Sequence, residues 1–151
     1  MTRIDVASFN HTSFTVHDLD RTIAFFVEGC GFELLSRAPR DPQLIERMTG
    51  IAGVEVEIAF VQGPAHRLEI IKYSAPQDRQ VVRPRFCDIG AWHVALDVPD
   101  MQAALKTAEA YGFTIAGEVI AIDAGPNAGR SVAYVRDEDG LTVEFLELAK
   151  T

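Results

Sequence analysis

Two stretches of the chain decide the fold: NHTSFTVHDLDRTIAFFVEGCGFELL at residues 10–35 and WHVALDVPDMQAALKTAEAYGFTIA at residues 92–116. The second repeats the order of the first: a histidine, an alternating apolar segment, an aspartate, an amphipathic segment and a Gly-Phe pair. The segments RLEII (67–71) and TVEFL (142–146) extend the repetition, each with a central glutamate. Chance readily pairs apolar residues, but not His, Asp, Gly-Phe and Glu in one order. The sequence therefore indicates an internal duplication of about 60–70 residues per copy.

Each copy predicts a β-α-β-β-β unit. An aspartate, Asp18 or Asp100, follows the first strand at an N-cap position and opens a helix of roughly 12 residues. A glycine, Gly31 or Gly112, stands where helices commonly end. The expected strands are 12–16, 32–36, 54–61 and 66–73 in the first copy, and 94–98, 113–120, 130–135 and 141–148 in the second.

One domain, residues 1–151, is expected, made of one module at 7–74 and another at 90–149. The segment 39–53 interrupts the first copy and predicts either a short helix around Leu44–Met48 or a mobile lid. The segment 73–90 contains two prolines and is expected to connect the two copies.

The composition is typical of an acidic globular protein. The chain has 151 residues, of which 48% are hydrophobic and 24% charged, and its net charge is −8. Nucleic acids and anionic membranes need a basic surface, so neither partner is expected. No segment approaches the roughly 20 apolar residues that span a bilayer, and no secretory signal is visible. We therefore expect a cytoplasmic protein with a small-molecule partner, in which Cys30 and Cys87 are reduced thiols.

Strand alternation places four candidate metal ligands on the sheet faces turned away from the helices. His11 and His93 take this face at the start of the first strands, and Glu69 and Glu144 take it in the last strands. Glu144 lies in an otherwise apolar strand and needs a compensating partner, because an unpaired buried charge costs several kcal/mol. If each copy curls its sheet, the four side chains converge in the concavity.

Two imidazoles and two carboxylates form a mixed nitrogen and oxygen set that suits one divalent ion: Zn, Ni, Co, Fe or Mn. A five- or six-coordinate ion would keep one or two positions open, as a catalytic site requires. Each residue alone has a structural alternative, such as a hydrogen-bonded core histidine or a glutamate paired with arginine. Their repeat-equivalent positions favour the metal interpretation. Glu55 and Glu57 are expected in solvent, with a place in the cavity wall as the alternative.

The chain resembles the vicinal oxygen chelate superfamily in four motifs: FNHTSFTVHDLDRTIAFF, HRLEII, AWHVALDVPDMQAAL and VAYVRDEDGLTVEFLE. This superfamily includes glyoxalase I, methylmalonyl-CoA epimerase, extradiol dioxygenases and the fosfomycin and bleomycin resistance proteins. The resemblance covers about residues 8–148. It implies the α+β glyoxalase/bleomycin resistance/dioxygenase fold, in which two βαβββ modules form a curved mixed sheet around a central cavity, usually in a homodimer. The metal ligands of the superfamily map onto His11, Glu69, His93 and Glu144.

The ligand set narrows the activity that the resemblance implies. Extradiol dioxygenases and fosfomycin-modifying members use three ligands, whereas a His-Glu-His-Glu set is most similar to glyoxalase I and close to methylmalonyl-CoA epimerase. We expect a divalent-metal-dependent lyase or isomerase acting on a small oxygenated metabolite through a metal-stabilised enolate. Glu144 first and Glu69 second would carry the proton. The additional acid of the epimerases falls on 51–52, Ile-Ala here, so a second base would have to be Glu55 or Glu57.

Two alternatives stay open: an Fe(II) ring-cleaving dioxygenase of extradiol type, and a binding or resistance protein that sequesters a ligand without chemistry. Tyr73, Trp92 and Arg130 are candidate substrate residues in the cavity, and core packing is the alternative for the two aromatic residues. Arg37, Arg85 and Arg130 are the candidate cations for a substrate that carries carboxylates, as glutathione does.

Overall fold

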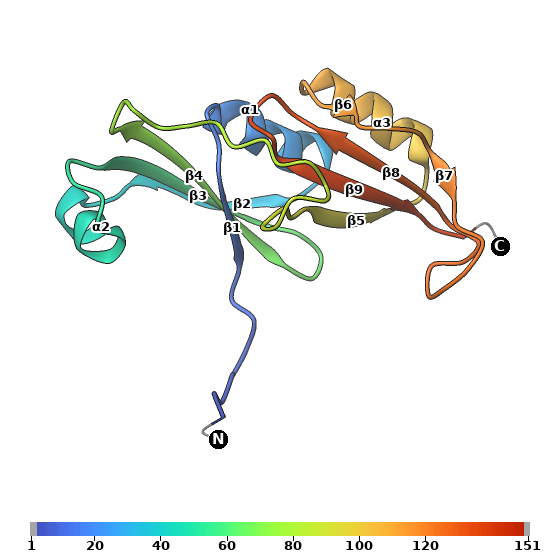
Figure 1. The fold of residues 1–151 in the computed structure, drawn as a ribbon, viewed down its shortest axis with the longest axis horizontal. Coiled ribbons are helices and arrows are strands. Elements are labelled where there is room, and N and C mark those ends of the chain that lie inside the picture. Colours follow the sequence, from blue (N-terminus) through green and yellow to red (C-terminus); the bar gives the residue numbers. More distant parts are fainter. Residues whose placement is uncertain (1–2, 150–151) are drawn as a thin grey trace. The chain divides into compact units, whose positions relative to one another are not determined.

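The computed structural model describes residues 3–149 of a chain that divides into two compact units, Met1–Asp78 and Arg79–Thr151 (Figure 1). The first unit contains β1 (Thr12–Thr15), α1 (Leu19–Ala24), a π-helical turn (Phe25–Gly29), β2 (Glu33–Pro39), α2 (Pro42–Thr49), β3 (Glu55–Gln62) and β4 (Arg67–Ala75). The second contains β5 (Val94–Val98), α3 (Met101–Ala110), β6 (Thr114–Ile115), β7 (Ile120–Ala121), β8 (Ser131–Arg136) and β9 (Thr142–Glu147).

The two units repeat one topology. The first sheet has the order β1-β4-β3-β2, and the second has the order β5-β9-β8-β6, with β7 also paired to β8. In both sheets the first strand runs parallel to the last, and the other pairings are antiparallel. The duplicated βαβββ arrangement and the α+β class expected from the sequence are thereby confirmed.

Helix capping follows the sequence pattern. The Asp18 carboxylate accepts a hydrogen bond from Arg21 N at 2.9 Å, and the Asp100 carboxylate accepts one from Ala103 N at 3.0 Å. Both aspartates therefore satisfy an amide of the first helical turn, as N-cap residues do. The first helix continues beyond Ala24 as the π-helical turn, so the apolar helix face is longer than α1 alone.

The core of each unit lies between the helix and one face of the sheet. In the first unit, Leu19 and Phe26 on the helix side and Leu68 and Ile70 of β4 are among the most deeply buried side chains. In the second, Met101 and Ala108 of α3 cover Val143 and Phe145 of β9. Because strand residues alternate between faces, burial of these residues places the glutamate of each last strand on the opposite face.

Two segments differ from a simple reading of the pattern. The single strand expected over 113–120 is two short strands, β6 and β7, because Gly117 has φ 143° and breaks the extended run. The segment 39–53 contains the helix α2, so the expected short helix is present. Asp41 caps α2 through Gln43 N at 2.9 Å, and Gly50 ends it in the left-handed conformation. No helix within residues 3–149 is long and apolar enough to cross a membrane.

Candidate active site

The first unit brings His11 and Glu69 together. β1 and β4 are parallel neighbours with Ser13 in register with Glu69, and His11 lies two residues before Ser13. The His11 Nε2 to Glu69 Oε2 distance is 3.3 Å, and the two side chains are 31% and 16% exposed. His11 Nδ1 lies 2.7 Å from Asn10 Oδ1, a carbonyl oxygen that can only accept a hydrogen bond. In the neutral imidazole this contact leaves the lone pair on Nε2, directed at the Glu69 carboxylate.

The second unit repeats this pair at equivalent positions. Ala95 of β5 is in register with Glu144 of β9, and His93 lies two residues before Ala95. The His93 Nε2 to Glu144 Oε2 distance is 2.8 Å, and the Glu144 side chain is 14% exposed. Each predicted histidine therefore meets its predicted glutamate within one unit.

The geometry of both pairs fits ligation of a cation. Two donor atoms bound to one zinc-like ion at about 2.0–2.2 Å, with an angle between 90° and tetrahedral, lie about 2.8–3.6 Å apart. The two observed nitrogen–oxygen distances, 3.3 and 2.8 Å, fall in this range. A nitrogen lone pair and a carboxylate oxygen at such a distance need a positive centre between them, which a proton or a divalent ion provides. Within residues 3–149, His, Cys, Asp and Glu side chains form no metal-binding group of three or more, so a four-ligand site stays a prediction.

The family model described as Glyoxalase/Bleomycin resistance protein/Dioxygenase superfamily matches residues 8–145. The chain belongs to this superfamily. It is 32% identical over 144 residues to a 2-epi-5-epi-valiolone epimerase from an Actinomyces species, with 92% of this chain and 78% of that protein covered. It is 28% identical over 149 residues to a lactoylglutathione lyase from Haemophilus influenzae, with 93% of each covered. A crystal structure of a glyoxalase family protein from Bacillus cereus has a TM-score of 0.83 at 24% identity, over 99% of both chains.

Two aromatic residues that sequence reasoning missed belong to the pairs of this glyoxalase-superfamily chain. Phe60 of β3 is in register with Glu69, and Tyr134 of β8 is in register with Glu144. The Phe60 ring meets His11 edge-on with centroids 5.6 Å apart, and the Tyr134 ring meets His93 edge-on at 5.4 Å. The signal was present in the sequence, as AF at 59–60 and AY at 133–134 in the strand before each glutamate.

Tyr134 also reaches the carboxylate. Tyr134 lies directly opposite Glu144 across β8 and β9. Burial first, followed by a hydrogen bond to Glu144 and the charge of Glu144, raises the pKa of Tyr134. The phenol is therefore a protonated donor at neutral pH. Phe60, in the equivalent place beside Glu69, has no hydroxyl.

The candidate substrate residues have different surroundings. Tyr73 is half-buried and packs, with Phe60 and Ile71, against an apolar cluster that includes Ile45 of α2. Trp92 precedes His93 and is 44% exposed. The Tyr73 contacts favour the packing role that the sequence left open, whereas Trp92 keeps an accessible surface next to a predicted ligand.

The three candidate cations are each paired with carboxylates. Arg37 binds Glu57 and Asp20, Arg85 binds Asp88, and Arg130 binds Asp97 at 2.5 Å. Arg130 also donates to three protein oxygens, those of Asn127, Leu146 and Glu147. These contacts favour a structural role for Arg130 over the expected contact with substrate.

Neither Glu55 nor Glu57 lies on the face of Glu69. Glu57 pairs with Arg37 beside Asp20 of α1, and Glu55 bonds Ser74 at 3.2 Å, so both lie on the helix side of the sheet. The alternative in which they line the cavity is wrong for this unit, and so is their use as a second base beside Glu69.

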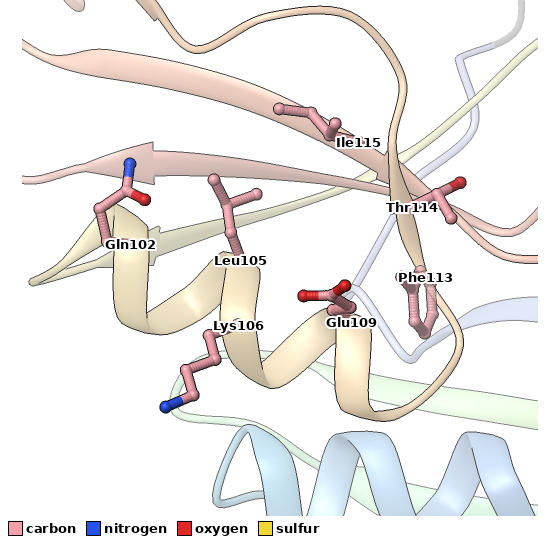
Figure 2. A pocket seen from close by; sticks show the side chains of 7 residues that line it. All are labelled: Gln102, Leu105, Lys106, Glu109, Phe113, Thr114 and Ile115. Carbon is pink, nitrogen blue, oxygen red and sulfur yellow. The ribbon is translucent and has the colours of Figure 1, made fainter.

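A hollow of about 410 Å³ lies elsewhere in the second unit, between α3 and β6 (Figure 2). Leu105 of α3 and Ile115 of β6 border it, together with the charged side chains Lys106 and Glu109. Since α3 covers the face of the sheet opposite Glu144, this hollow is separate from the His93–Glu144 pair.

Proposed function

We propose that this chain is a divalent-metal-dependent lyase or isomerase in which His11, Glu69, His93 and Glu144 together bind one ion. The observation that carries the proposal is the matching His–Glu pair on equivalent parallel strands of each unit. The names of the relatives, an epimerase and a lactoylglutathione lyase, support an enzyme that moves protons on a small oxygenated substrate. The homodimer implied by the family resemblance is part of the same proposal.

The chemistry follows from the donor set. A divalent ion bound there would act as a Lewis acid on a substrate carbonyl oxygen. Glu144 takes the proton from the adjacent carbon, and the electron pair of the broken C–H bond moves to the carbonyl oxygen. Glu144 then delivers the proton to the neighbouring carbon while the hydroxyl proton on that carbon's oxygen passes to the former carbonyl oxygen, so the product is an isomer and the reaction consumes no other reagent. The carboxylate suits this role because it is 14% exposed, which limits competition from water.

A polyhydroxylated cyclic ketone is the substrate class we propose first. It offers the adjacent oxygens that a chelating ion needs, and the relative named as an epimerase of such a compound has 32% identity over most of the chain. A hemithioacetal of glutathione comes second, because Arg37, Arg85 and Arg130 are all engaged with carboxylates of the chain.

Substitution of Glu144 tests the function. General-base catalysis contributes about 10²–10⁴-fold, so Glu144→Gln should lower kcat by that factor. Glu118→Gln, which alters an exposed glutamate of the same unit, is the matched control and should leave kcat unchanged. Turnover would be measured as the incorporation of deuterium from D₂O into the ketone and into the hemithioacetal. Each measurement would be made on protein stripped of metal by a chelator and again after each candidate ion is returned.

Full turnover by the chelated protein or by Glu144→Gln would end the proposal. Consumption of O₂ with a catechol would favour the ring-cleaving dioxygenase. Tight binding of a ligand without turnover of either substrate would favour the binding or resistance protein.

A further inference from the structure

The duplicated pairs differ by one hydroxyl group. Phe60 and Tyr134 occupy the same register position opposite the two glutamates and make the same edge-on contact with the two histidines. Only Tyr134 carries a hydroxyl group, and it lies directly opposite Glu144 in the strand register. The two candidate proton carriers, Glu69 and Glu144, are therefore not equivalent in this chain.

The Tyr134 ring contacts two other rings. His93 meets it at 5.4 Å between centroids, and Phe86 packs against it at 4.9 Å. The Arg136 guanidinium lies 4.7 Å from the centre of the Phe86 ring, and Arg136 Nε donates to Thr142 Oγ1 at 2.9 Å. A ring packed in this way fixes where its hydroxyl points, so the donor is in place before any movement of the carboxylate.

A carboxylate that bound an ion would have to give up part of that bond before it could accept a substrate proton. Its negative charge then needs another partner, because a poorly solvated, uncompensated charge is strongly unfavourable. The Tyr134 hydroxyl supplies that partner for Glu144, whereas the Phe60 ring offers Glu69 none. A hydrogen bond to a charged group changes an equilibrium by about 10- to 100-fold.

We infer that Tyr134 is a positioning residue that holds the Glu144 carboxylate in place to accept a proton, and that it thereby makes Glu144, rather than Glu69, the proton carrier. This inference rests on the proposed function and adds an asymmetry between the two carboxylates. The hydroxyl acts through Glu144 and exchanges no proton with the substrate.

The test compares Tyr134→Phe with Tyr111→Phe, which removes a hydroxyl at the end of α3. Tyr134→Phe keeps the ring and should lower kcat about 10- to 100-fold with KM changed less than about twofold. Binding of Co²⁺ measured by calorimetry should be unchanged or tighter, and the visible spectrum of the Co²⁺ protein should keep its shape. Tyr111→Phe should leave all of these quantities unchanged.

Transfer of the hydroxyl gives a second readout. In the double variant Phe60→Tyr with Tyr134→Phe, part of the lost activity should return, and Glu69→Gln should then cost more than it does in the wild-type background. Return of activity without this new dependence on Glu69 would overturn the inference.

Two further results with the single variant would also overturn it. One is an unchanged kcat in Tyr134→Phe, and the other is a loss of Co²⁺ affinity as large as the loss of turnover, which would mean a purely structural role. If Glu144→Gln is inactive in the same preparation, the proposed function stands even though the role of Tyr134 fails.

Discussion

Arg130 provides the sharpest stability prediction, because its contacts can be enumerated. Its side chain is 17% exposed and joins β5 to the end of β9. Nη2 donates to Asp97 Oδ1 at 2.5 Å and to the Leu146 carbonyl at 3.1 Å, Nε donates to the Glu147 carbonyl at 3.1 Å, and Nη1 donates to Asn127 Oδ1 at 3.3 Å. Arg130→Met keeps the length of the side chain and removes every one of these bonds.

The expected cost is about 1–4 kcal/mol. The two backbone carbonyls account for most of it, at about 0.5–1.5 kcal/mol for each hydrogen bond. The ion pair with Asp97 adds at most about 1 kcal/mol, because the Asp97 side chain is 60% exposed and water screens the attraction. For a chain of this size, a loss of about 3 kcal/mol lowers Tm by about 6–12 °C.

Urea unfolding followed by circular dichroism would measure the effect, with Asp97→Asn as the matched control. The control removes the exposed ion pair alone and should lose less than about 1 kcal/mol. The reasoning would be refuted if Arg130→Met lost less than about 0.5 kcal/mol. A raised KM in such a stable variant would restore Arg130 to the substrate role that the sequence suggested.

Two further predictions concern titratable groups. Burial raises the pKa of the Cys30 thiol to about 12. In folded protein at pH 8 only the exposed Cys87 should therefore react rapidly with Ellman's reagent, whereas both thiols should react in denaturant. Rapid reaction of two thiols in the folded chain would contradict this prediction. The Arg37 guanidinium, through its hydrogen bonds, holds the pKa of Glu57 below its ordinary value. The pair therefore stabilises the protein above the unfolded carboxyl pKa, and this contribution is lost as pH falls through the lower folded value. Arg37→Met should be less stable than wild type at pH 7 and equal to it in strong acid; a difference independent of pH would contradict the pairing.

The fold could be predicted from the sequence because the internal duplication and the alternation of apolar and polar residues in the strands indicate the same arrangement. Repeat-equivalent positions predict the same topology for both copies, and the period of two in the strands places His11 and Glu69 on one sheet face. The two His–Glu distances, 3.3 and 2.8 Å, follow from the parallel pairing of the first and last strands in each unit.

Other features depend on register, which a single strand does not specify. Tyr134 faces Glu144 only because β8 pairs antiparallel with β9 in one alignment, and the same is true of Phe60 and Glu69. The hydrogen-bond partners of individual side chains could not be predicted from the sequence either. Arg130 resembled a free cation in the sequence, yet its acceptors come from segments far from it along the chain, including Asp97.

The parallel pairing of β1 with β4 also bears on the order of assembly. The histidine and the glutamate of each pair are separated by about 50 to 60 residues of intervening chain, and bringing such distant points together has an entropic cost. No short fragment of either unit could form the pair, since the strand that supplies the glutamate is the last of its unit to be synthesised. Formation of a His–Glu contact would therefore report that its half of the chain has finished folding.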